Sequence, residues 1–121
     1  MSAPGQKTPG LKSSRVKALG IIETRGRAPL IEAVDAAIKG ANVELLASYF
    51  VGGGCNTVTL TGDVGAVRAA LDAAQSVIDT FGIEGRTHLI PRPDEQVWLM
   101  IIPKAAQALK TKDKLENGYG T

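Results

Sequence analysis

The fold is decided by residues 57–81, which read TVTLTGDVGAVRAALDAAQSVIDTF. The β-branched run 57–61 predicts a strand, and Gly62 with Asp63 closes it. Asp63 is a good N-cap for a following helix, and Gly82 suits the C′ position at its end. Between them one apolar face recurs at helical spacing, and it consists of Val64, Val67, Leu71, Ala74, Val77, Ile78 and Phe81. A strand therefore leads directly into an amphipathic helix.

A similar strand and helix precede this pair. The run 16–22 predicts a strand buried on both faces, and residues 23–26 predict a turn. Pro29 suits the first turn of the next helix, where its missing N–H costs nothing, and Asn42 ends that helix. The apolar face of this helix is rich in alanine, which requires close packing on a neighbour; it consists of Leu30, Ala33, Val34, Ala37, Ile38 and Ala41.

Two further strands complete the expected sheet. Residues 43–51 predict the second strand and residues 86–91 the fourth. The apolar run 97–102, stopped by Pro103, fits either a short helix or an extended segment. The order βαββαβ favours an α+β fold, an antiparallel sheet with two helices on one face. The other face of the sheet needs cover, which assembly would provide.

The chain of 121 residues is long enough for one domain with its own core. We expect this domain over 16–103, flanked by the polar segments 1–15 and 104–121. These two segments carry net charges of +3 and +2, whereas 16–103 has seven Lys or Arg against ten Asp or Glu. Without a basic stripe on the folded part, nucleic-acid binding is not expected. The single cysteine excludes an internal disulfide and favours a cytoplasmic setting, and no apolar run reaches the ~20 residues of a membrane span.

Residues that could carry catalysis are few. His88, the one histidine, lies in an expected strand without a Ser or Cys nucleophile nearby in sequence, so a structural role is favoured over that of a general base. No group of Cys and His has the spacing of a zinc site. The triplet Gly52–Gly54 matches neither the phosphate-loop nor the dinucleotide-binding pattern. We therefore expect no enzyme activity.

The glycine triplet itself needs a reason, because three glycines between strands give up conformational entropy on folding. One interpretation is a loose hairpin turn. The other is a close approach of the backbone to a ligand, or to copies of the same loop around an axis. The residues alone leave both interpretations open.

Four blocks of sequence resemble, in the same order, signatures of bacterial microcompartment shell proteins. They read ALGIIETRG at 18–26, KGANV at 39–43, GDVGAV at 62–67 and HLIPRP at 88–93. The resemblance covers 16–103 and implies the single-domain, hexamer-forming class, with the ferredoxin-like BMC domain. It implies flat hexamers that tile, with other shell proteins, into the facets of a polyhedral shell around encapsulated enzymes in the cytoplasm.

The resemblance also implies roles for individual residues. Gly52, Gly53 and Gly54 match the pore loop, whose six copies ring the hexamer axis and control which small metabolites cross. Gly53 stands where many members have a serine, which implies a wider or more adaptable pore. Lys39 and Arg92 match residues at the edge between hexamers, where they donate hydrogen bonds to opposing carbonyls. The alternative for both is plain surface charge.

Three positions depart from the family pattern. Phe50 replaces a lysine that is common two residues before the loop, which implies the loss of a positive ring and a weaker preference for anionic solutes. Asp94 replaces a histidine, and Cys55 replaces an aliphatic residue. Cys55 has two interpretations: a buried small hydrophobe, or one of six thiols gathered at the axis as ligands of one 4Fe–4S cluster per hexamer.

Three functions stand as alternatives. The first is a structural shell tile with a metabolite pore, with neither catalysis nor a cofactor. The second is an electron-transfer shell protein whose iron–sulfur cluster is held by Cys55. The third is a regulatory domain of ferredoxin-like shape that binds a small molecule as a dimer or small oligomer, and the four blocks argue against it. The lysine-rich segment 104–121 either recruits cargo enzymes or stays solvated.

Overall fold

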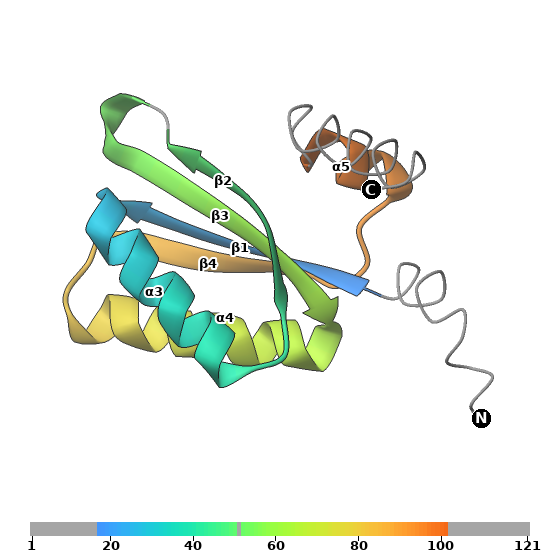
Figure 1. Ribbon diagram of the computed structural model, residues 1–121, viewed down its shortest axis with the longest axis horizontal. Coiled ribbons are helices and arrows are strands. Elements are labelled where there is room, and N and C mark those ends of the chain that lie inside the picture. Colours follow the sequence, from blue (N-terminus) through green and yellow to red (C-terminus); the bar gives the residue numbers. More distant parts are fainter. Residues whose placement is uncertain (1–16, 51, 102–121) are drawn as a thin grey trace, which may run out of the picture.

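A four-stranded antiparallel sheet forms the centre of the molecule (Figure 1). The structure is a computed structural model that describes residues 17–50 and 52–101, so the expected tails at 1–15 and 104–121 lie outside the described part. The elements along the chain are β1 (Lys17–Arg25), α3 (Arg27–Gly40), β2 (Glu44–Phe50), the 3-10 turn η1 (Gly52–Gly54), β3 (Cys55–Asp63), α4 (Val64–Thr80), β4 (Gly85–Ile90) and α5 (Glu95–Ile101). The α+β class and the βαββαβ order are confirmed, with α5 added at the end.

The strands lie in the order β2-β3-β1-β4, so that β1 is central and pairs with two neighbours. Its pairing with β3 runs from Lys17↔Asp63 to Arg25↔Cys55. The turn expected at 23–26 is wrong, because residues 23–25 continue β1 and pair with β3, and residues 23 and 24 also with β4. The chain turns only at Gly26, whose φ of +98° is a left-handed value that glycine adopts without strain.

Both long helices cover the same face of the sheet (Figure 1). Their buried side chains are mostly small, which lets α3 and α4 pack closely on each other and on β1; the buried residues are Leu30, Ala33, Val34 and Ala37 of α3, and Val67, Ala70, Leu71, Ala74 and Ile78 of α4. α3 begins at Arg27, so Pro29 lies in the first turn as expected. Its end at Gly40 is two residues before the predicted one.

The ends of α4 agree only in part with expectation. Gly82 takes the left-handed φ of +64°, and the Ile83 amide donates to the Ile78 carbonyl at 2.9 Å, as in a Schellman cap. Asp63 occupies the N-cap position, but its side chain makes no capping hydrogen bond. The predicted apolar faces were too wide, because Val64 and Phe81, like Ile38 of α3, are exposed.

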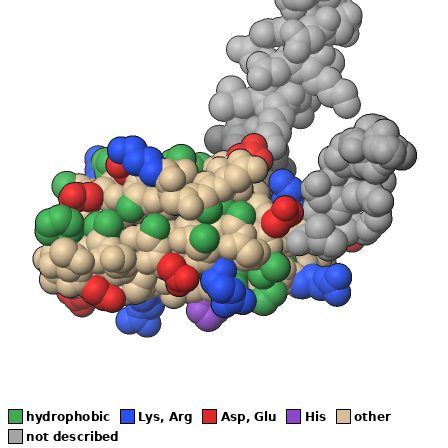
Figure 2. All heavy atoms as spheres, turned by 90° about the horizontal axis from the view of Figure 1, so that it is seen from below, with side chains coloured by type: hydrophobic (Ala, Val, Ile, Leu, Met, Phe, Trp, Pro, Cys, Tyr) green, Lys and Arg blue, Asp and Glu red, His purple; other side chains and the backbone are tan. Residues whose placement is uncertain are grey.

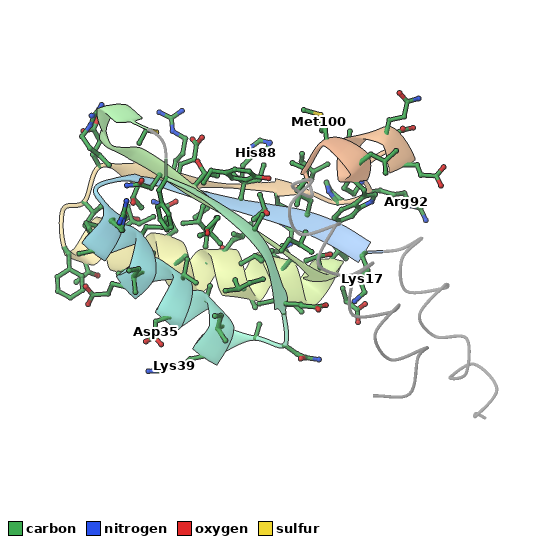
Figure 3. The ribbon with its side chains drawn as sticks, turned by 45° about the horizontal axis from the view of Figure 1, so that its top comes forward. Lys17, Asp35, Lys39, His88, Arg92 and Met100 are labelled. Carbon is green, nitrogen blue, oxygen red and sulfur yellow. The ribbon has the colours of Figure 1, made fainter. Side chains whose placement is uncertain are left out.

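The sequence of the run 97–102 fits either a short helix or an extended segment, and α5 shows that the described part of this run is helical. α5 lies on the other side of the sheet from α3 and α4 (Figures 1 and 3). The Tyr49 hydroxyl donates to the Ile101 carbonyl, which ties the end of α5 to β2. On the face seen in Figure 2, acidic, basic and hydrophobic side chains are interspersed.

Candidate functional site

The glycine triplet connects β2 to β3, and two of its three residues have a left-handed backbone conformation. Gly53 and Gly54 have φ values of +89° and +82°, a backbone region that L side chains rarely adopt. A Cβ added to Gly53 would meet nothing within 4 Å, so the backbone conformation, and not lack of space, requires glycine there. Both residues are exposed. Gly53 and Gly54 therefore expose backbone atoms without side chains at one end of the molecule.

The carbonyls of this loop are held by the segment that leaves β1. The Gly54 carbonyl accepts from the Gly26 amide at 2.8 Å and from Asn56 Nδ2 at 3.3 Å. The Gly53 carbonyl accepts from Arg25 Nη1 at 3.0 Å. The loop does join the antiparallel neighbours β2 and β3, so it is a hairpin connection, but with these anchors it is not a loose one.

Arg25 joins the loop to a third part of the chain. Its Nε donates to Glu84 Oε1 at 3.1 Å, while its backbone amide donates to the Glu84 carbonyl at 2.9 Å. One arginine thus connects the end of β1, the loop after β2 and the segment before β4. Sequence reasoning missed Arg25 and Glu84, and the available signal was topological: the end of β1 must lie beside the start of β3.

Cys55 begins β3 beside the loop and lies opposite Arg25 in the sheet register. The interpretation of Cys55 as a buried hydrophobe is wrong, because the residue is exposed. It borders a hollow of about 250 Å³ that is lined by Glu23, Thr24, Arg25, Cys55, Glu84, Gly85 and Arg86. The hollow has two carboxylates and two guanidinium groups, so it carries no strong net charge.

A 4Fe–4S cluster needs four ligands, for which thiolates are the usual donors. Within residues 17–50 and 52–101, no group of three or more His, Cys, Asp or Glu side chains is placed to hold a metal. A single chain offers one thiol, so its residues do not fit a cluster. Ligands from several copies would be required, and the cluster, which is one of the two interpretations of Cys55, stays an untested alternative.

Phe50 is the last residue of β2, and its ring contacts a cationic side chain. The guanidinium carbon of Arg27 lies 4.5 Å from the centroid of the Phe50 ring. Arg27 is the first residue of α3, so the pair links that helix to the strand before the loop. Sequence reasoning missed Arg27 as well.

The two expected edge residues are separate within one molecule. Lys39 lies in the last turn of α3, where its Nζ is 2.9 Å from Asp35 Oδ2. Arg92 is exposed between β4 and α5, and Figure 3 places the two residues well apart. His88 is exposed on β4, opposite Ile21 of β1. Their expected roles stay predictions.

The described part of the chain thus combines a ferredoxin-like sheet, two helices on one face and a fixed glycine loop. The family model of the BMC domain matches residues 18–93. The chain is 46% identical over 88 residues to the bacterial microcompartment shell protein PduA of Citrobacter freundii, covering 73% of this chain and 94% of the relative. It is 47% identical over 93 residues to the major carboxysome shell protein CsoS1A of Halothiobacillus neapolitanus, covering 75% and 93%.

Among solved structures, a microcompartment protein from Desulfitobacterium hafniense DCB superposes with a TM-score of 0.59 at 30% identity. The match covers 68% of this chain and 44% of the other, so this chain spans less than half of that protein. The chain belongs to the BMC domain family. The structural role in a microcompartment shell, which the four blocks implied, is confirmed. Among the described helices, none has the length and apolar character needed to cross a membrane.

Proposed function

We propose that the chain forms closed hexamers in which the Gly52–Gly54 loops of six copies border a central pore for small metabolites. The observation that carries this proposal is the loop, which is exposed at Gly53 and Gly54, free of side chains and yet fixed by Arg25 and Gly26. A fixed loop without side chains can border a passage of constant width. The shell role of the family supports this use, because a closed shell needs passages for its substrates and products.

Unpaired surfaces of the protomer support assembly. β2 and β4 are the outer strands of the sheet, and each leaves one row of backbone groups without a strand partner among the described residues. Such edges are ready to contact another chain. Large apolar side chains are also exposed, and they include Ile31, Phe81, Leu99 and Met100, of which Met100 is 77% exposed. Neighbouring copies would cover part of this surface.

In this proposal Lys39 and Arg92 act at the edge between hexamers, and the tile assembles with other shell proteins around encapsulated enzymes. The exposed positions of both residues support the edge role. The proposal needs neither a catalytic residue nor a cofactor, because the shell role is structural.

Native mass spectrometry of the purified full-length chain tests the assembly directly. We expect one dominant species of six chains, and images of the same sample should show discs with a central opening. Monomers and dimers alone would contradict the proposal and favour the small regulatory domain.

A further inference from the structure

Arg27 and Phe50 place a positive charge beside the glycine loop. The guanidinium carbon lies 4.5 Å from the ring centroid, within the ~6 Å over which an aromatic face attracts a cation. Phe50 stands two residues before Gly52, and the residue is 44% exposed. The ring restrains the long side chain of Arg27 without neutralising it. The charge is therefore held in place and stays accessible to solvent.

The neighbouring Arg25 does not offer the same free charge. Its Nε is paired with Glu84 at 3.1 Å, and its Nη1 donates to the Gly53 carbonyl. Within residues 17–50 and 52–101, the ion pairs are Arg25–Glu84 and Lys39–Asp35, so Arg27 has no carboxylate partner there. Arg25 fixes the loop, and Arg27 supplies uncompensated charge next to it.

The chemistry of this pair suits small anions. A guanidinium keeps its charge at every physiological pH, and its N–H groups can bind an oxyanion while one face rests on an aromatic ring. The carbonyls of Gly53 and Gly54 accept hydrogen bonds from this protomer, so these two acceptors are already engaged. A passing anion would meet donors and positive charge at this end of the molecule.

We propose that Arg27, held on the ring of Phe50, makes the pore selective for small anions. The proposal rests on the proposed function, because copies of Arg27 come together only where copies of the loop surround one axis. A ring of like charges raises the local concentration of anions and lowers that of cations. Phe50 in place of the common lysine, taken alone, predicts a weaker preference of the pore for anions. This proposal replaces that prediction, since Arg27 restores the charge that a lysine at position 50 would carry.

The test measures the reversal potential of full-length hexamers in planar bilayers under a gradient of potassium chloride, and then of potassium acetate. We expect both anions to be more permeant than potassium in the wild type. Arg27→Gln should lower the anion-to-cation permeability ratio by about threefold or more. Adding Phe50→Lys to that variant should restore the ratio. The preference should also weaken in 1 M salt, where the screening length falls to about 3 Å.

Arg68→Gln is the matched control, because Arg68 is an exposed arginine near the start of α4, an end of that helix away from the loop. It removes the same charge and should leave the ratio unchanged. An unchanged ratio in Arg27→Gln, or an equal loss in Arg68→Gln, overturns the selectivity proposal. Six-chain assemblies that conduct without anion preference contradict this proposal alone, whereas six-chain assemblies that conduct no ions also contradict the pore of the proposed function. The absence of any six-chain species overturns the proposed function as well.

Discussion

Gly85, at the start of β4, has no room for a side chain. A Cβ there would lie 2.6 Å from the Glu23 carbonyl oxygen, which belongs to the backbone of the neighbouring strand and cannot move aside cheaply. We expect Gly85→Ala to lower the free energy of unfolding by about 1–3 kcal/mol, the usual cost of overpacking. Urea unfolding followed by circular dichroism measures this.

The matched control for this change is Gly65→Ala. Gly65 lies in the first turn of α4, and a Cβ there would meet nothing within 4 Å. Alanine favours a helix over glycine by up to about 1 kcal/mol, so this variant should be as stable as the wild type or more so. Equal losses in the two variants would contradict the packing argument for Gly85.

Arg25 is predicted to act on the loop more than on global stability. Its pair with Glu84 is exposed, and exposed ion pairs contribute between about 0 and 1 kcal/mol. Arg25→Gln also removes the hydrogen bond to the Gly53 carbonyl. Hydrogen exchange of the amides at 53–55 should become several-fold faster, while the unfolding midpoint stays nearly unchanged. Unchanged exchange at these amides would show that Arg25 does not hold the loop.

At the scale of elements, the contact between α3 and α4 depends on small side chains. Ala37 is fully buried in this contact region. Ala37→Leu is expected to cost about 1–3 kcal/mol or to impair assembly, because the extra volume forces the helices apart. Ala69→Leu, at an exposed position of α4, is the control. Thermal melting of both variants gives the comparison, and an unchanged melt of Ala37→Leu would count against a tight contact.

The prediction about the tiling of hexamers into sheets concerns the C-terminal end of α3. Lys39 is exposed and its only ion pair in the described residues is with Asp35, one helical turn away. Lys39→Ala should leave hexamers intact and reduce the formation of extended sheets, as seen by electron microscopy. Asp35→Ala removes the same ion pair but keeps the lysine, so it should leave sheets largely intact. Normal sheets from Lys39→Ala would remove the edge role.

Helices and strands could be predicted from the sequence because the regular spacing of their apolar residues is visible within a short stretch of chain. Their ends were less predictable, because pairing partners decide them. β1 continues through residues 23–25 since β3 and β4 offer partners there. The exposure of Phe81 and Val64 was also missed, because helical periodicity shows which residues share a face but not where the neighbouring sheet ends.

Only those parts of the candidate site that stand out in the sequence itself could be predicted. Three adjacent glycines and a cysteine are visible in the sequence. The contact of Arg25 with Glu84 joins residues 59 positions apart, and its contact with Gly53 joins residues 28 positions apart. No local pattern encodes such contacts. The pair of Arg27 and Phe50 likewise depends on α3 and β2 meeting at one end of the fold.

At the scale of the whole molecule, the prediction concerns what an assembly contains. Anaerobic purification followed by native mass spectrometry should give a six-chain mass without added iron, because the structural role in the shell requires no cluster. A six-chain mass with four extra iron and four extra sulfide would support the electron-transfer alternative. Cys55→Ser must then abolish the extra mass while it preserves the six-chain species.

The central place of β1 has a consequence for the way the protein is made. Among the described strands, β1 is the first to leave the ribosome and pairs with β3 and β4, and β4 is the last of them to be synthesised. During translation β1 must therefore wait for partners that do not yet exist, and contacts between distant parts of a chain form slowly. The four-stranded sheet is complete only after residue 90 has left the ribosome. New copies can therefore assemble with one another only late in synthesis, when almost the whole domain has emerged.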